Sequence, residues 1–112
     1  MPLKVYYVDD EPELCELFAD LFSSSEISIS TFTDSIVALR TILESPPDLL
    51  FMDFRMPGLN GLELAQKLNP QLKKYLISGE NNLAMDYPFE AILSKPFNVK
   101  LIQQILASAK LL

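Results

Sequence analysis

The chain has 112 residues, 49% of them hydrophobic and 21% charged, as expected for one folded domain with one core over residues 1–112. Its net charge of −6 comes without a basic cluster. We therefore expect no nucleic-acid binding by this domain, because phosphate contacts need clustered Lys and Arg. The absence of histidine excludes histidine-based catalysis, and the apolar runs are too short to span a membrane.

Apolar runs alternate with helical patterns along the chain, which predicts βα units around a parallel sheet. A strand is expected at 3–8, and Pro12 suits the first turn of the helix that follows. Residues 27–30 alternate between Ile and Ser, which is typical of a half-buried edge strand. The predicted apolar face of the first helix consists of Leu14, Leu17, Phe18, Leu21 and Phe22.

Asp34 is a suitable N-cap for a second helix, whose predicted apolar face consists of Ile36, Leu39 and Leu43. The run 49–52 is apolar without alternation, which predicts a central strand covered on both faces. A turn-rich loop at 54–61 precedes a short helix at 62–68.

Two further strands are expected at 75–77 and 91–94. Asn98 is expected to cap a last helix, with its apolar face formed by Leu101, Ile102, Ile105, Leu106 and Ala109. The segment 79–90 holds poor helix formers and Pro88, so we expect a fourth helix there to be reduced or absent.

Charged residues follow three of the expected strands. Asp9 and Asp10 come after the first, Asp53 after the third, and Lys95 after the last. Neighbouring parallel strands end at one edge of a sheet, where clustered carboxylates repel each other and favour a divalent cation. A nearby lysine can hold a phosphoryl oxygen, so the pattern indicates a site where a carboxylate is phosphorylated.

Each residue also has a simpler interpretation by itself. The acidic pair suits a helix N-terminus, Asp53 suits a turn, and Lys95 suits a solvated surface. Ser78 suits the end of a strand. Their joint placement at one edge favours a site. Tyr6 and Tyr7 are interpreted as packing residues, and Cys15 as a partly buried, unreactive thiol.

These motifs together give the chain a family resemblance. Asp9-Asp10, the stretch 53–61 (DFRMPGLNG), Ser78 and Lys95-Pro96-Phe97 resemble the response-regulator receiver domain of two-component signalling. The resemblance implies a flavodoxin-like, doubly wound sheet of five parallel strands in the order 2-1-3-4-5. It also implies that the Lys95-Pro96 bond is cis.

The resemblance further implies a Mg²⁺ site and a phosphoacceptor. Asp53 would take the phosphoryl group. Asp10 would bind the metal directly and Asp9 directly or through water, while Asp53 and the backbone carbonyl of Arg55 would complete the protein ligands.

Other groups would hold the phosphoryl oxygens. Lys95 would pair with one of them, and the Ser78 hydroxyl would hydrogen-bond to another. The backbone N–H groups of Arg55 and Gly79 would supply further donors.

Two features depart from the family pattern. Ile92 occupies the position where the family often has Tyr or Phe as a switch, and an aliphatic side chain cannot make the aromatic movement. The short segment 79–90 replaces part of the usual output and dimerisation face.

The leading interpretation is a phosphoaccepting module, not an enzyme with a turnover substrate beyond its own phosphorylation and dephosphorylation. Its expected partners are a sensor histidine kinase or phosphotransfer protein and a downstream effector, with a homodimer possible. A phosphorylation-independent interaction domain is the alternative. A haloacid-dehalogenase-type phosphatase is disfavoured, because Arg55 stands where a second Asp is required. The absence of a signal-peptide pattern predicts a cytoplasmic location.

Overall fold

The sheet has five parallel strands in the order β2-β1-β3-β4-β5, which confirms the predicted topology. The computed structural model describes residues 2–80 and 86–110. The elements are β1 (Leu3–Val8), α1 (Pro12–Phe22), β2 (Ile27–Phe32), α2 (Ser35–Glu44), β3 (Leu49–Asp53), α3 (Gly61–Gln66), β4 (Lys73–Ser78), β5 (Ala91–Ser94) and α4 (Val99–Lys110).

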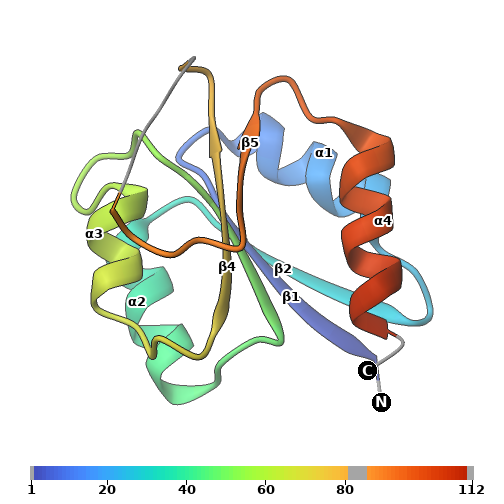
Figure 1. The fold of residues 1–112 in the computed structure, drawn as a ribbon, viewed down its shortest axis with the longest axis horizontal. Coiled ribbons are helices and arrows are strands. Elements are labelled where there is room, and N and C mark those ends of the chain that lie inside the picture. The colour runs from blue at the N-terminus through green and yellow to red at the C-terminus, as the bar shows by residue number, and fades with distance from the viewer. Residues whose placement is uncertain (1, 81–85, 111–112) are drawn as a thin grey trace.

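Helices cover both faces of the sheet (Figure 1). On one face, α1 and α4 pack through Phe18 and Ile102 against Phe51 of β3. On the other, α2 and α3 pack against Leu50 and Met52. Every residue of β3 is buried, so it is the predicted central strand, and β2 lies at the predicted edge.

Polar side chains fix where the helices begin. Asp34 accepts hydrogen bonds from the backbone N–H groups of Ile36 at 2.8 Å and Val37 at 3.2 Å. Asn98 accepts from Leu101 N at 3.1 Å. Both predicted caps are confirmed, and they satisfy donors that have no partner within the helix.

The predicted face of α1 was partly wrong. Leu17 and Leu21 are 43% and 39% exposed, whereas Cys15, Phe18 and Phe22 are buried. The helix is therefore rotated toward Cys15, which lies in the buried core.

The predicted face of α2 was wrong by one position. Ser35, Ala38 and Ile42 are buried, while Leu43 is 63% exposed. Ser35 is buried because its hydroxyl donates to Pro57 O at 3.1 Å and accepts from Leu59 N at 3.0 Å.

The last helix also differs in part from its predicted face. Ile102 and Leu106 are buried, but Leu101 is 38% exposed. Leu101 lies at the flank of the buried face of α4 and is therefore partly exposed to solvent.

The connection from β4 to β5 contains no helix among its described residues, 79–80 and 86–90. The part of the prediction that concerns 81–85 lies outside the described residues. Tyr87 and Phe89 pack against the α2–α3 side of the core, and Tyr87 donates a hydrogen bond to Ala65 O at 3.2 Å. Among the described helices, none has the length and apolarity needed to cross a bilayer.

Candidate functional site

The carboxyl ends of four strands bring the predicted site residues together. Pairing of Val8 with Met52 places Asp9 beside Asp53. Ser78 pairs with Ser94, the residue directly before Lys95, so Ser78 and Lys95 lie at the same edge of the sheet. The backbone N–H of Lys95 donates to Ser78 O at 3.0 Å. The Lys95-Pro96 bond is cis.

Three carboxylates lie close together at this edge. One carboxylate oxygen from each of Asp9, Asp10 and Asp53 lies within 4.8 Å of the others. Asp9 is fully buried and Asp53 is 5% exposed, whereas Asp10 is the most exposed of the three. Asp10 thus offers the approach from solvent, and the other two form the floor.

Lys95 bridges the two buried carboxylates. Its Nζ lies 3.1 Å from Asp53 Oδ1 and 3.3 Å from Asp9 Oδ2. Burial lowers the pKa of Lys95, but the pairs with Asp53 and Asp9 outweigh it, so the pKa is raised overall. The amine is therefore a fixed positive charge at neutral pH.

The environment of Asp53 disfavours its charged form. Burial, followed by the negative charge of Asp9, raises the pKa of Asp53 to about 6, against the opposing effect of Lys95. A cation beside Asp53 therefore favours the ionised carboxylate, which is the form that can act as a nucleophile.

Asp9 is held by protein groups. Its Oδ1 accepts from Glu11 N at 3.0 Å, and its Oδ2 accepts from the Tyr7 hydroxyl at 2.5 Å. The interpretation of Tyr7 as packing alone missed this contact. Strand alternation offered a signal, because residues 7 and 9 lie on the same face of an extended chain.

The end of β4 supplies a hydroxyl. Ser78 is 2% exposed, and its Oγ accepts a hydrogen bond from Glu80 N at 3.0 Å, which leaves the hydroxyl proton free to be donated. The Arg55 side chain forms an ion pair with Glu80 and so lies across the loops that follow β3 and β4. A Cβ at Gly79 would meet no atom within 4 Å.

Comparisons with known proteins show the family of the chain. The model of the response regulator receiver domain matches residues 5–107. The chain belongs to this family. Receiver domains are the phosphoaccepting modules of two-component signalling; they are not classical enzymes, and they generally bind Mg²⁺ at an acidic cluster.

Several relatives share the sequence or the fold. The receiver is 32% identical over 101 residues to an uncharacterized response regulatory protein of Vibrio cholerae, covering 77% of this chain and 38% of that protein. It is 30% identical over 104 residues to the nitrogen assimilation regulatory protein NtrX of Azorhizobium caulinodans, covering 84% of this chain and 23% of that protein. The chain thus spans well under half of these relatives.

The receiver domain of NtrX from Brucella abortus has a similar structure. It is 28% identical, superposes with a TM-score of 0.81, and the match covers 95% of this chain and 97% of that one.

The receiver's acidic cluster fits a hard divalent cation. Three carboxylates offer oxygen ligands, and the exposure of Asp10 leaves room for the waters that Mg²⁺ retains. The donor set contains no histidine or thiolate, so it does not favour a softer metal.

The predicted switch position lies on β5. Ile92 is 40% exposed, and its side chain cannot make the aromatic movement expected of the family. Its role in switching stays a prediction.

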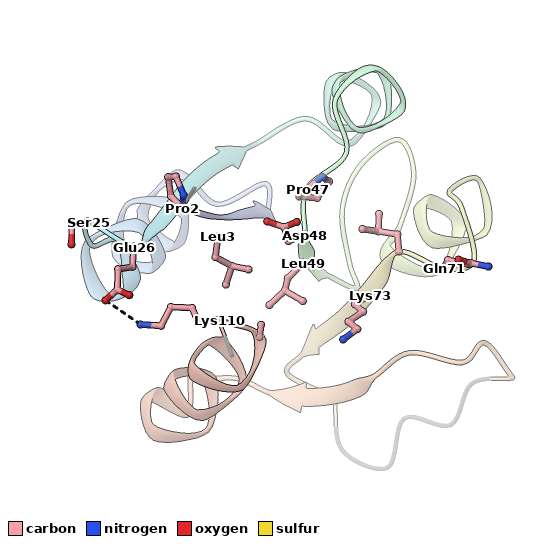
Figure 2. Close-up of a pocket in the computed structure, with 12 residues that line it drawn as sticks. Pro2, Leu3, Ser25, Glu26, Pro47, Asp48, Leu49, Gln71, Lys73 and Lys110 are labelled. Carbon is pink, nitrogen blue, oxygen red and sulfur yellow. Dashed lines mark ion pairs between the residues drawn. The ribbon is translucent and has the colours of Figure 1, made fainter. Parts of the chain in front are cut away.

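A separate hollow lies away from the acidic site. It has a volume of about 820 Å³ and is lined at the beginnings of β1, β3 and β4 by Leu3, Leu49 and Lys73, with the Lys110–Glu26 ion pair across one side (Figure 2). Because Asp53 stands at the opposite end of β3, this hollow is not part of the acidic site.

Proposed function

We propose that the chain is a single receiver domain, residues 1–112, in which Asp53 accepts a phosphoryl group in a Mg²⁺-dependent step. The donor is a phosphohistidine on a sensor histidine kinase or phosphotransfer protein. The observation that supports this assignment is the placement of the Asp53 carboxylate between two acidic neighbours and the Lys95 amine. The family membership supports it independently.

Asp53 is the nucleophile of the proposed transfer. One of its carboxylate oxygens forms a bond to phosphorus while the phosphorus–nitrogen bond of the donor breaks, and the electron pair of that bond goes to the imidazole nitrogen. Asp9, Asp10, Asp53 and the backbone carbonyl of Arg55 would hold the metal. When bound, Mg²⁺ neutralises charge between the carboxylate and the incoming phosphoryl oxygens.

Other residues hold the phosphoryl group after transfer. The Lys95 amine moves from Asp53 to a phosphoryl oxygen, because conversion of the carboxylate to an acyl phosphate removes one of its ion-pair partners. The Ser78 hydroxyl donates to a second oxygen, and the backbone N–H groups of Arg55 and Gly79 supply further donors.

The proposed output is a signal and not a released product. Response regulators interact with histidine kinases and effectors. We infer that this domain relays its phosphorylation state to an effector domain or partner protein, with its own hydrolysis ending the signal. We also propose a homodimer as an assembly of this domain.

The test is labelling with radioactive phosphoryl donors. Acetyl phosphate or a phosphorylated histidine kinase should label the wild type with Mg²⁺, and the label should be lost in hydroxylamine, which cleaves acyl phosphates. Asp53→Asn should abolish the label, whereas Asp20→Asn, exposed on α1, should keep it. A label that persists in Asp53→Asn would contradict the mechanism.

A phosphorylation-independent interaction domain is the second candidate. The aliphatic, exposed Ile92 favours it, because the aromatic switch is absent. Partner binding that is equally strong for wild type, phosphorylated protein and Asp53→Asn would support this candidate over the first.

A further inference from the structure

The aromatic ring of Tyr7 is buried at the back of the acidic site. Tyr7 is 0% exposed and stacks on Phe18 with ring centroids 4.4 Å apart and planes 3° apart. The ring of Phe97 lies beside this stack and nearly perpendicular to it, with its centroid 5.8 Å from that of Tyr7 and 5.7 Å from that of Phe18. This packing leaves the Tyr7 hydroxyl directed at Asp9 Oδ2, 2.5 Å away.

We propose that Tyr7 is a positioning residue, whose hydroxyl fixes the Asp9 carboxylate for Mg²⁺ binding and lets Lys95 leave Asp9 during phosphorylation. The inference rests on the proposed function of Asp53 and assigns a role to a residue outside the family motifs.

The fixing role follows from the burial of Asp9. Its side chain is 0% exposed, so water cannot replace a missing donor. Tyr7 and Glu11 N hold the two different oxygens of the carboxylate, which sets both its position and its rotation. Residues that hydrogen-bond to metal-binding carboxylates orient them, and their loss typically weakens metal affinity by about 10- to 100-fold.

The second role, release of Lys95 from Asp9, follows because Lys95 and Tyr7 contact the same oxygen of Asp9. Lys95 Nζ lies 3.3 Å from the same Asp9 Oδ2 that accepts from Tyr7. If Lys95 were its sole donor, movement of the amine to a phosphoryl oxygen would leave a buried charged oxygen unsatisfied, which is costly. The Tyr7 hydroxyl remains as a donor, so the amine can move at lower cost.

The aromatic cluster of Tyr7, Phe18 and Phe97 connects the segment that carries Lys95 with the strand that precedes Asp9. Phe97 follows Lys95 by two residues, and its ring packs nearly perpendicular to the rings of both Tyr7 and Phe18. Packing of Phe97 therefore ties the segment that carries Lys95 to strand β1, which ends just before Asp9.

Tyr6 provides a matched control. It is also buried, on the opposite face of β1, and its hydroxyl donates to Ser45 O at 2.8 Å. Tyr6→Phe and Tyr7→Phe each remove one tyrosine hydroxyl from the same strand, but only the second removes a contact with the acidic site.

The experiment measures the dissociation constant of Mg²⁺ by calorimetry and the rate of labelling by acetyl phosphate at saturating Mg²⁺. Tyr7→Phe should bind Mg²⁺ about tenfold more weakly and be labelled more slowly even at saturation, whereas Tyr6→Phe should match the wild type in both. In Mg²⁺-free wild type, the Tyr7 hydroxyl proton should be visible by NMR because of its buried hydrogen bond.

The outcomes separate this inference from the proposed function. Equal Mg²⁺ affinities and labelling rates in Tyr7→Phe and Tyr6→Phe would overturn the role of Tyr7 while leaving Asp53 as the phosphoacceptor. A wild type that binds no Mg²⁺ and takes no label would overturn the proposed function itself. Should Tyr7→Phe not fold, absence of the hydroxyl resonance in the wild type would by itself refute the inference.

Discussion

Replacing Asp53 by Asn should stabilise the Mg²⁺-free protein, although it destroys the proposed phosphoacceptor. Burial and the charge of Asp9 raise the pKa of Asp53 from its ordinary 3.8 to about 6, despite the ion pair with Lys95. The ionised carboxylate is therefore less stable in the folded protein than in the unfolded chain. An Asn side chain has nearly the same shape as the Asp53 side chain but carries no charge, so the substitution removes this cost.

The magnitude follows from the two pKa values. Their difference of about two units corresponds to about 3 kcal/mol, at 1.36 kcal/mol for each unit. Between pH 3.8 and about 6 the folded state binds more protons than the unfolded state, so stability falls as the pH rises through this window. Asp53→Asn should thus raise the free energy of unfolding by about 1 kcal/mol at pH 4.5 and by about 3 kcal/mol at pH 7.5.

Urea denaturation in EDTA at several pH values measures the difference in the free energy of unfolding between Asp53→Asn and the wild type. In a separate thermal melt at pH 7.5, the melting temperature of Asp53→Asn should exceed that of the wild type by on the order of 10 °C. Asp20→Asn, which removes an exposed carboxylate from α1, is the control and should leave the curve of stability against pH unchanged.

The reasoning is refuted if Asp53→Asn is no more stable than the wild type at pH 7.5, or if its advantage is the same at pH 4.5. Either result would mean that the ionised Asp53 carboxylate is not disfavoured in the folded protein.

Three further predictions concern the metal, a glycine and the thiol. Mg²⁺ at about ten times its dissociation constant should stabilise the wild type by about 1.4 kcal/mol, and Asp10→Asn should remove most of this gain in thermal melts. Gly61→Ala should destabilise by about 1–3 kcal/mol in urea, because its Cβ would lie 2.7 Å from the backbone oxygen of Asp53; Gly79→Ala, with open space around its Cβ, should have little effect on stability. Cys15, whose pKa burial raises to about 11, should react with iodoacetamide at pH 8 only after unfolding.

The edge of the sheet that carries the site could be predicted from sequence because its signals are local and agree with each other. Asp9, Asp53 and Lys95 each follow an apolar strand, and strand order alone brings them together. The caps at Asp34 and Asn98 were equally predictable, since each depends on a side chain and the backbone two or three residues away.

The rotation of the helices could not be predicted in the same way. A hydrophobic stripe shows that α2 has an inner face, but its position depends on contacts distant in sequence. The hydroxyl of Ser35 turns inward because Pro57 and Leu59 supply its partners, and Leu43 consequently lies outward. Tyr7 was misread for a related reason: its hydrophobic ring explains its burial, while its hydroxyl depends on Asp9.

The expected cost of ionising Asp53 in the metal-free protein is linked to the proposed function of the site. Asp9, Asp10 and Asp53 carry three negative charges when ionised, and Lys95 offsets one of them. A divalent cation matches the remaining two. Burial and then the negative charge of Asp9 raise the pKa of Asp53, and relief of that repulsion is part of the driving force for metal binding. Once the metal offsets that repulsion, Lys95 is no longer needed between Asp9 and Asp53. Its amine then becomes available to the phosphoryl group, whose arrival brings new negative charge to the same edge.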